Sequence, residues 1–337
     1  MSDASTTLLD SRGRPLHDLR ISVTDRCNFR CNYCMPKASF GPGFQFLPRP
    51  ELLSFEELTR LAGIFVGLGV RKLRITGGEP LLRSELPSLI RMLAPLGAEI
   101  ALTTNGSLLA QHAAPLFEAG LRRVTVSLDS LDDATFRALN DVDFPVSKVL
   151  AGIDAASGVG LRVKVNAVIR RGFNQDSVVE LARHFKGSGH VVRFIEFMDV
   201  GITNGWRLDQ VVSASEMIAA IDAEFPLEPI AENYSGEVAR RYRYQDGTGE
   251  VGVIASVTEP FCSSCTRARL SANGQLHLCL FSSHGTDLRA TLRDGSSDAQ
   301  VTELLRALWA QRSDRYSALR TENTRSLPKI EMSYIGG

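Results

Sequence analysis

Short runs rich in Val, Ile and Thr recur through the first 200 residues of the chain. This is the composition expected of buried β-strands. Two of the runs lie in the segments RITGGEP and LTTNG, where the apolar pattern passes directly into a polar loop that contains glycine. The strands predicted from these runs span residues 19–24, 72–77, 99–104, 123–128, 162–169 and 191–198.

Helical patterns lie between the predicted strands. Residues 54–69 begin with Ser54 and carry Glu57 three positions later, which is the arrangement of a capping box. Apolar residues also recur at helical spacing in 145–160 and 176–185. Six strands that alternate with helices predict an α/β fold, a partial (βα)6 TIM-type barrel, with an open doubly wound sheet as the alternative. In such a barrel the functional residues lie at the carboxyl ends of the strands.

The alternation stops near residue 200. We expect a loop at 199–206, a helix with a second capping box at 213–225 and a polar, β-rich stretch at 232–256. A helix at 301–312 then precedes a tail that ends in EMSYIGG. With a boundary near residue 220, the two predicted parts of the chain are residues 1–220, which form the barrel, and 221–337, which form a C-terminal extension.

The composition is that of a globular protein, with 44% hydrophobic and 23% charged residues. Lys plus Arg and Asp plus Glu both number 38, so the formal net charge is zero and no global field attracts nucleic acid or anionic lipid. Any bound anion must be held by local arginines and lysines. The first 18 residues contain no apolar segment typical of a signal peptide or membrane anchor, so we expect a cytoplasmic protein.

The six cysteines fall into two sets of three, which do not pair tidily into local disulfides. Cytoplasm keeps thiols reduced, so metal ligation is the favoured interpretation. The first set has the spacing C-x3-C-x2-C, which suits an iron–sulfur cluster. Three cysteines hold three irons of a [4Fe–4S] cube and leave the fourth iron open to a small molecule. The two sets are Cys27, Cys31 and Cys34, and Cys262, Cys265 and Cys279.

Other interpretations of the cysteines remain open. Zinc at the first set would need a fourth Cys or His, and the nearest upstream histidine, His17, is ten residues away. The second set, C-x2-C-x13-C, would form a zinc knuckle if His277 or His284 completed it. Between its cysteines, however, Arg267 and Arg269 occupy alternate positions and share one face of an extended segment. Such a pair favours a pocket for an anionic ligand.

The first cysteine motif, CNFRCNYC, resembles that of the radical S-adenosylmethionine enzymes, and TGGEP resembles their glycine-rich motif after the second strand. The second cysteine set and the final Gly-Gly narrow the resemblance to the GTP 3′,8-cyclase family of molybdenum cofactor biosynthesis. Similar segments run in family order from LRISVTDRCNFRCNYC to SYIGG. The first dozen or so residues and a variable stretch at 200–250 remain uninformative.

The resemblance implies cyclisation of GTP to (8S)-3′,8-cyclo-7,8-dihydroguanosine 5′-triphosphate, with two [4Fe–4S] clusters and S-adenosylmethionine as cofactors. Each cysteine set would ligate one cluster. The implied contacts of S-adenosylmethionine are Tyr33, Gly78, Ser127 and Met198. Those of GTP are Arg20, Arg74, Thr103, Lys164, Arg267 and Arg269, with Arg193 as a further candidate. The residues implied to assist catalysis are Arg20 and, on a flexible tail, Gly336 and Gly337.

The resemblance also implies partners. These are an electron donor of the flavodoxin or ferredoxin type and, downstream, cyclic pyranopterin monophosphate synthase, with no nucleic acid or membrane partner and a monomeric or homodimeric state. One alternative is another radical S-adenosylmethionine enzyme with an auxiliary cluster, such as a peptide maturase, although those usually carry more C-terminal cysteines. The other is a non-enzymatic metal-binding protein.

Overall fold

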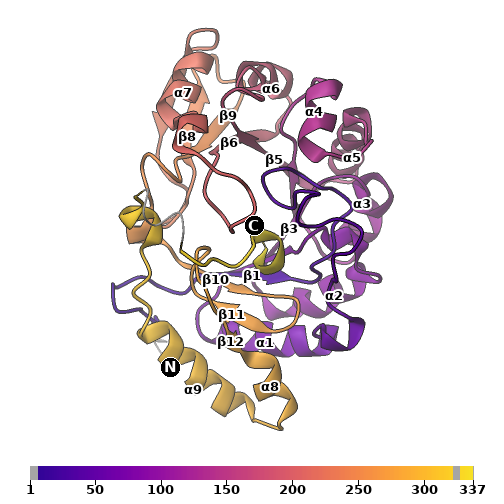
Figure 1. Ribbon diagram of the computed structural model, residues 1–337, viewed down its shortest axis with the longest axis vertical. Helices are drawn as coiled ribbons and strands as arrows, with labels where there is room; N and C mark the ends of the chain where they lie inside the picture. The colour runs from indigo at the N-terminus through magenta and orange to yellow at the C-terminus, as the bar shows by residue number, and fades with distance from the viewer. Residues whose placement is uncertain (1–6, 322–326, 337) are drawn as a thin grey trace.

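A 12-stranded sheet organises the protein, whose computed structural model describes residues 7–321 and 327–336. The strand order is β12-β11-β10-β1-β2-β3-β4-β5-β6-β9-β8-β7. Neighbouring strands are parallel from β10 through β1–β6 to β9, and the flanking pairs at both ends are antiparallel. The sheet curves into an arc with helices on its outer side (Figure 1). It is the partial barrel that the sequence predicted.

The six strands predicted from the apolar pattern are all present, and their ends agree with the prediction to within two residues. The strands of the barrel are β1 (Asp18–Ser22), β2 (Lys72–Thr76), β3 (Glu99–Thr104), β4 (Arg123–Ser127), β5 (Arg162–Ile169) and β6 (Val191–Glu196). The strands that follow are β7 (Leu227–Ile230), β8 (Arg240–Tyr244), β9 (Glu250–Ile254), β10 (Arg267–Leu270), β11 (Gln275–His277) and β12 (Thr286–Asp287).

Both predicted capping boxes are formed, at Ser54 with Glu57 and at Ser213 with Glu216. The helices are α1 (Phe55–Gly67), α2 (Leu86–Leu93), α3 (Leu109–Glu118), α4 (Asp133–Asn140), α5 (Val146–Gly158), α6 (Ser177–Phe185), α7 (Ala214–Asp222), α8 (Leu288–Arg293), α9 (Asp298–Ala310) and α10 (Met332–Ile335). Short 3-10 turns are η1 (Arg49–Glu51), η2 (Pro80–Leu82), η3 (Ala94–Leu96), η4 (Leu208–Gln210), η5 (Cys262–Ser264) and η6 (Tyr316–Leu319). The helix predicted at 301–312 begins three residues earlier, because Ser297 and Gln300 form a further capping box.

Side chains of the parallel strands alternate between two environments, as the pleat of a strand requires. Leu19 and Ile21 of β1 point outward and are fully buried in a core that also contains Leu61 of α1. Asp18 and Arg20 of the same strand point to the other side and line a central cavity. Each barrel strand therefore anchors itself through its apolar face and presents polar groups inside.

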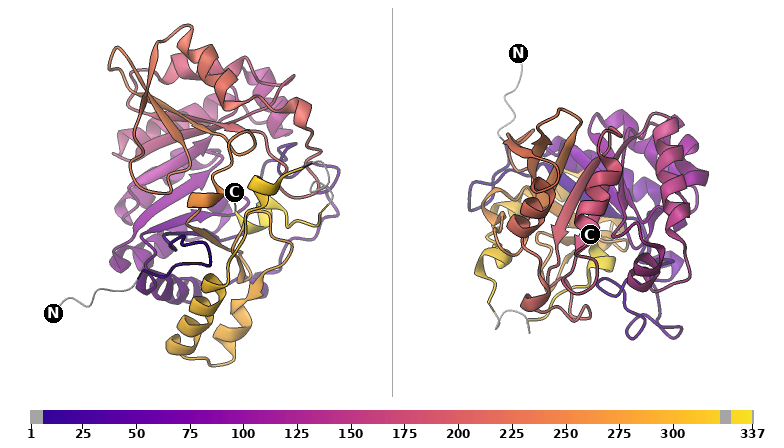
Figure 2. Two further views of the ribbon diagram at one scale, coloured as in Figure 1. Left: turned by 90° about the vertical axis from the view of Figure 1, so that its left-hand side faces the viewer. Right: turned by 90° about the horizontal axis from the view of Figure 1, so that it is seen from above.

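The C-terminal part of the chain extends the barrel at both edges. Strand β9 pairs parallel with β6, and β10 pairs parallel with β1, so segments beyond the sixth βα unit complete the wall. Figure 2 shows the orange β7–β9 segments at one end of the sheet and the golden helices near β10–β12 at the other. Both parts of the chain thus share one sheet, and the division near residue 220 stays a prediction.

A loop after β7 lies between the two ends of the sheet. The Oη atom of Tyr234 accepts a hydrogen bond of 2.8 Å from Nζ of Lys72, at the start of β2. A Cβ atom on Gly236 would lie 3.0 Å from Cγ2 of Thr266, next to β10. The loop therefore reaches from the β7–β8 hairpin to the opposite edge of the barrel.

The last described residues fold back into the opening of the barrel, where α10 contacts β1 (Figure 1). Ser333 and Ile335 are buried. The loop after β6 holds this segment: the carboxylate of Glu331 accepts hydrogen bonds from the Ile202 backbone and the Thr203 hydroxyl, both 3.0 Å long. Up to Gly336 the predicted flexible tail is therefore packed, and Gly337 lies outside the described residues.

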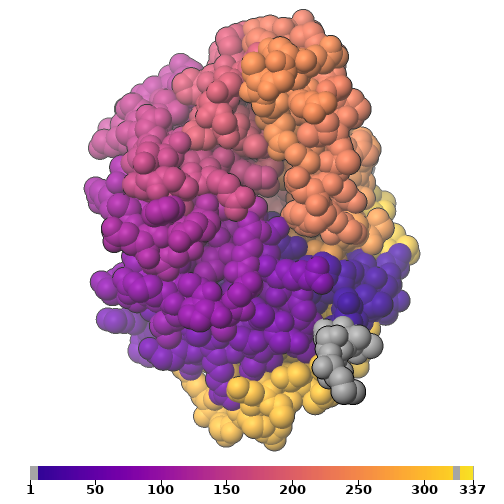
Figure 3. Space-filling model, turned by 180° about the vertical axis from the view of Figure 1, so that it is seen from behind, coloured from indigo at the N-terminus to yellow at the C-terminus, as the bar shows by residue number. Residues whose placement is uncertain are grey.

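Seen from behind, residues of the N-terminal half, in purple, cover much of this face and the orange segment lies at the upper right (Figure 3). Within residues 7–321 and 327–336, none of the helices combines the length and the apolar character needed to cross a membrane.

Candidate active site

A cavity of about 900 Å³ opens inside the arc of parallel strands. Gly336 borders it by contacting Thr76, a residue of the cavity wall. The structure therefore brings together every predicted site residue that it describes. The predicted residues in the wall are Cys27, Cys31, Cys34, Cys262, Cys265, Cys279, Tyr33, Gly78, Ser127, Met198, Arg20, Arg74, Thr103, Lys164, Arg193, Arg267 and Arg269.

The first cysteine set occupies the loop that follows β1. The backbone N–H groups of Cys34 and Met35 both donate to the carbonyl of Cys31, at 2.9 and 2.8 Å, and hold the loop in a tight turn. The Cys27 sulfur accepts a hydrogen bond of 3.4 Å from the Phe29 backbone. Burial, together with the carboxylate of Glu79, raises the pKa of the Cys27 thiol to about 11. A metal must therefore displace a proton to bind here.

Gly77 and Gly78, directly after β2, leave no room for a side chain, because the loop that carries the first cysteine set passes very close to them. A Cβ atom on Gly78 would lie 2.3 Å from the carbonyl oxygen of Arg26, and one on Gly77 would lie 2.6 Å from that of Thr24. The N–H of Gly78 donates to the Thr24 carbonyl at 2.8 Å. Any side chain at either glycine would push the two loops apart.

Glu79 is a buried carboxylate that the sequence analysis did not single out, although it lies in the TGGEP segment. It accepts hydrogen bonds from the Asn105 backbone and the Thr104 hydroxyl, both 2.7 Å, and from the Leu81 backbone at 3.0 Å. Burial raises its pKa to about 7. Glu79 thereby fastens the loop after β2 to the loop after β3, and Asn105 in turn contacts the Cys27 sulfur at 3.8 Å.

Asp129 is a second buried carboxylate that the sequence analysis missed. It follows β4, and its position at a strand end was the one available indication. Its Oδ2 atom accepts a hydrogen bond of 2.6 Å from the Tyr33 hydroxyl, and its Oδ1 atom accepts one of 2.8 Å from the Val168 backbone. Burial raises its pKa to about 6. Asp129 fixes the aromatic ring of Tyr33 beside the first cysteine set.

Strand register places three arginines in a row across the cavity wall. Arg20 of β1 lies opposite Arg269 of β10 on one side and opposite Arg74 of β2 on the other. Burial, and then repulsion by Arg269 and Arg74, holds the pKa of Arg20 well below its ordinary value. Arg74 donates to the hydroxyl of Thr103 at 3.1 Å. The row is an unneutralised set of donors facing an open space.

The other wall of the cavity continues this positive surface. Burial, followed by repulsion from Arg193 and Arg123, lowers the pKa of Lys164 to about 8. Among the described residues, the buried Nε atoms of Arg193, Arg267 and Arg269 have no hydrogen-bond partner. Buried donors of this kind normally have partners, so the cavity is suited to a large anion.

The floor of the cavity is neutral by contrast. Lys72 lies 3.7 Å from both Asp18 and Glu99, and Arg123 pairs with Glu99 at 3.0 Å. Asp18, Lys72 and Glu99 lie one layer below the arginine row in the strand register, whereas Arg123 is level with Arg74 through Ala101. The row of Arg20, Arg74 and Arg269 therefore lies above a layer in which Lys72 faces two carboxylates.

The second cysteine set borders the same cavity, with Cys262 at the start of η5, Cys265 directly after it and Cys279 after β11. Burial alone would raise the pKa of Cys265, but the charges of Arg267 and Arg312 outweigh it and hold the pKa at about 6. Within the described residues, no group of three or more His, Cys, Asp or Glu side chains is placed to hold a single metal ion.

The donors present fit iron–sulfur clusters. All six cysteines are free, and each set offers three sulfurs to the cavity, as a cube with one open iron requires. N–H groups donate to a sulfur in both sets, namely to Cys27 and Cys265. Hydrogen bonds to ligand sulfurs are a regular feature of such clusters.

Comparison with known sequences identifies the family. The Radical SAM superfamily matches residues 21–185, and Molybdenum Cofactor Synthesis C matches residues 190–318. A GTP 3′,8-cyclase of Acidothermus cellulolyticus is 55% identical, covering 97% of this chain and 98% of its own. This chain belongs to the GTP 3′,8-cyclase family. The GTP 3′,8-cyclase of Staphylococcus saprophyticus is 51% identical, covering 98% of this chain and 99% of its own. That of Staphylococcus aureus is 48% identical, covering 97% of this chain and 98% of its own.

Solved structures agree with the radical S-adenosylmethionine fold of this cyclase family. Streptococcus suis SuiB bound to S-adenosylmethionine superimposes with a TM-score of 0.61 at 14% identity, over 93% of this chain and 72% of that chain. SuiB bound to its precursor peptide SuiA gives a TM-score of 0.59 at 13% identity, over 86% and 68%. At these identities the likeness shows the fold alone, and it confirms the fold class predicted from sequence.

Replacing Lys164 should stabilise the empty protein. Because the pKa of Lys164 in the fold is about 8, below its ordinary 10.5, the charged side chain destabilises the folded state below pH 8. This penalty fades as the pH rises from 8 to 10.5. We expect Lys164→Met to raise the stability at pH 7 by about 1 kcal/mol, or about 2 °C in Tm, after allowance for solvent screening.

Thermal unfolding of the cluster-free protein at pH 7 and pH 10 would measure this effect. The matched control is Lys148→Met, because Lys148 is exposed on α5. A Tm of Lys164→Met equal to that of the control at pH 7 would contradict the prediction.

Proposed function

We propose that this protein cyclises GTP to (8S)-3′,8-cyclo-7,8-dihydroguanosine 5′-triphosphate, the first step of molybdenum cofactor biosynthesis. The observation that carries the proposal is the shared cavity: both cysteine sets and a row of arginines face one space of about 900 Å³. Two cofactor sites and an anionic substrate can meet there. Full-length relatives with the name GTP 3′,8-cyclase support the same assignment.

The N-terminal half of the cavity would hold the first [4Fe–4S] cluster and S-adenosylmethionine. When bound, this cluster would supply the electron for reductive cleavage of S-adenosylmethionine, and with it the radical chemistry that removes the 3′ hydrogen of GTP. The chain's own part is positioning. Asn204 and the Val200 backbone donate to the carbonyl of Met198 at 2.9 and 3.0 Å, and Asp129 orients Tyr33. Gly78 and Ser127 complete the proposed contacts.

The middle of the cavity would hold the triphosphate of GTP. Arg20, Arg74 and Lys164 offer converging positive charge from three different strands, and Thr103 adds a hydroxyl. The guanine would lie at the second cluster, beside Arg267 and Arg269 on β10. Holding both ends of the nucleotide places the ribose between the two cofactors, where orientation contributes to the rate.

The remaining expectations from sequence are proposals as well. The protein would act in the cytoplasm, and its six free cysteines fit a reducing compartment. We propose an electron donor of the flavodoxin or ferredoxin type, delivery of the product to cyclic pyranopterin monophosphate synthase, and a monomer or homodimer as the working unit.

Anaerobic incubation of the reconstituted protein with reductant, S-adenosylmethionine and each nucleoside triphosphate in turn tests the function. We expect 5′-deoxyadenosine and a cyclised nucleotide with GTP alone, and about eight irons per chain for two cubes. Turnover of a peptide instead of GTP would favour the peptide maturase alternative. Colourless protein that contains zinc would favour the non-enzymatic one.

Replacing both Arg267 and Arg269 by alanine should separate the two binding regions. Two buried, charge-assisted donors would be lost from the GTP region, so we expect GTP affinity to fall by about 100-fold or more. Binding of S-adenosylmethionine should stay nearly unchanged. Calorimetry on the cluster-loaded protein measures both affinities. The control is Arg122→Ala, because Arg122 is exposed on the surface and stacks on Phe117 of α3. Equal losses for both ligands would count against separate regions.

Deleting Gly336 and Gly337 should spare cluster assembly and abolish cyclisation. The described part of the tail explains why glycine is needed: Gly336 has φ +75°, and a Cβ atom there would lie 2.3 Å from Cγ2 of Thr76. Gly336→Ala should therefore also reduce activity. Iron content and product formation are the measurements, and full activity of the truncated protein would refute the role of the tail.

A second substitution isolates the close approach. Thr76→Ser removes the methyl group that would clash, and the next nearest atoms of Thr76 lie 3.5 Å from the added Cβ. In Gly336→Ala, this change should restore part of the lost activity, with Thr76→Ser alone as the control. An unaltered defect would mean that the φ angle, not the contact with Thr76, requires glycine.

A further inference from the structure

The N-terminal segment before β1 forms a tight turn that delivers a buried carboxylate. The backbone N–H of Asp10 donates to the Arg14 carbonyl at 3.0 Å, and Gly13 has φ +74°. The Oδ1 atom of Asp10 accepts the N–H groups of Arg12 and Arg14, both at 2.9 Å. On the surface, this indigo segment lies between the orange and yellow parts of the chain (Figure 3).

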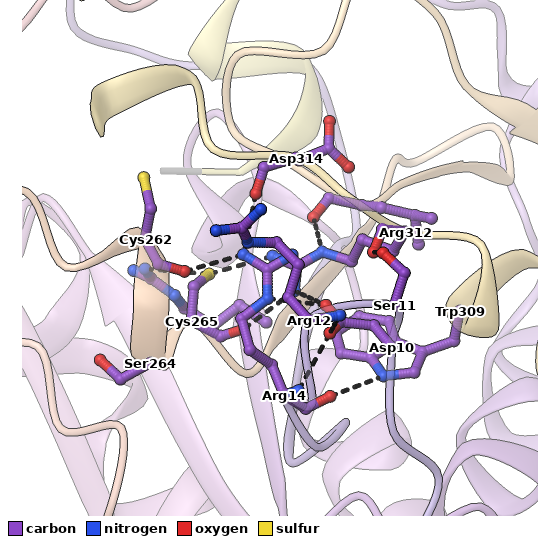
Figure 4. A network of polar contacts seen from close by, with 12 residues as sticks. Asp10, Ser11, Arg12, Arg14, Cys262, Ser264, Cys265, Trp309, Arg312 and Asp314 are labelled. Carbon is purple, nitrogen blue, oxygen red and sulfur yellow. Dashed lines mark hydrogen bonds and ion pairs between the residues drawn. The ribbon is translucent and has the colours of Figure 1, made fainter. Parts of the chain in front are cut away.

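Asp10 binds two buried arginines at its other oxygen (Figure 4). Its Oδ2 atom accepts from Nε of Arg14 at 2.7 Å and from Nη1 of Arg312, just after α9, at 2.9 Å. The three residues are only 6%, 2% and 3% exposed. One carboxylate and two guanidinium groups leave one positive charge in a buried place, which is unfavourable unless another anion faces it.

The two arginines reach the second cysteine set. Arg14 donates to the carbonyl of Cys262 at 2.7 Å, and Arg312 donates to the carbonyl of Cys265 at 2.9 Å. Arg312 also places Nη2 at 3.2 Å from the Cys265 sulfur. Arg14 thus donates only to a backbone carbonyl of this set, whereas Arg312 donates to a backbone carbonyl and to a sulfur. Neither side chain lines the cavity itself.

We propose that Arg312 is a positioning residue of the second cluster: it donates a hydrogen bond to the ligand sulfur of Cys265 and raises the cluster's reduction potential, while Asp10 and Arg14 fix its orientation. The inference rests on the proposed second [4Fe–4S] cluster. A thiolate at Cys265 would balance the surplus charge of the Asp10, Arg14 and Arg312 group. A nearby cation and a hydrogen bond to sulfur both favour the reduced, more negative cluster.

The geometry around Arg312 makes it suited to this task. Its Nε atom donates to the Leu278 carbonyl at 3.0 Å, next to Cys279, and its guanidinium lies 4.6 Å from the ring centre of Trp309. Ser11 donates to its backbone carbonyl at 2.7 Å. With its donors directed to four different groups, the side chain has one orientation, and the sulfur contact follows from it.

A matched pair of variants tests the inference. Arg312→Gln and Arg14→Gln each remove one of the two guanidinium groups on Asp10 and leave a neutral pair behind, but only the first removes a donor to the Cys265 sulfur. Arg267, which also donates to this sulfur, is unchanged in both variants. The measurement is a redox titration followed by electron paramagnetic resonance, in the full chain with Cys27→Ala, Cys31→Ala and Cys34→Ala so that the signal comes from the second set. Iron content is measured in parallel.

We expect one-electron reduction of the second cluster to become about tenfold less favourable in Arg312→Gln, a shift of about 59 mV to lower potential. Arg14→Gln should retain the parent potential, even if both variants lose similar thermal stability. Loss of iron from Arg312→Gln but not from Arg14→Gln would overturn the effect on the potential, since it would assign the sulfur contact to retention of the metal instead.

Equal potentials and equal iron contents in the two variants would overturn the inference alone. An iron content of about four rather than eight in the unsubstituted protein would overturn the proposed second cluster, and the inference with it. The two failures are distinguishable because they are measured on different proteins.

Discussion

The structure depends on positive charge concentrated at one level inside a barrel, where three arginines of neighbouring strands face a single cavity. Arg20, Arg74 and Arg269 lie side by side because the register of the parallel strands pairs Arg20 with both of the others. Mutual repulsion and burial both disfavour this arrangement in the empty protein. The apolar outer faces of the same strands, packed against the helices, provide the stability that offsets it. A site of this kind is prepared for a highly charged anion and is incomplete without one.

The loops at the rim of the barrel are positioned by contacts with one another. Gly78 allows the loop after β2 to touch the loop after β1, and Glu79 binds it to the loop after β3. Asp129 ties the loop after β4 to Tyr33. The loops that carry the proposed cofactor contacts therefore form one connected layer, so a displacement of any one of them would be transmitted to its neighbours.

Much of this could be predicted from sequence, because strands, helices and capping boxes are local patterns. The apolar runs located all six barrel strands, and Ser54 and Ser213 marked two helix starts. Cysteine spacing and family resemblance selected residues that share the cavity. Asp10 was missed because its partner Arg312 lies 302 positions away and neither residue belongs to a local motif. The path of the loop after β7 was missed for the same reason: the contact of its Tyr234 with Lys72 spans 162 positions.

The two cysteine sets differ in how much of the fold each requires. The first lies in a single loop after β1, and its nearest supports are the loops after β2, β3 and β4. The second is assembled from η5 and the segment after β11, and it is held by residues near both ends of the chain. Its backbone carbonyls are bound by Arg14 and Arg312, which meet only when the barrel has closed around β10 and α9 has docked. The geometry of the second cysteine set is thus a consequence of the complete fold, whereas that of the first is largely a property of the N-terminal βα units.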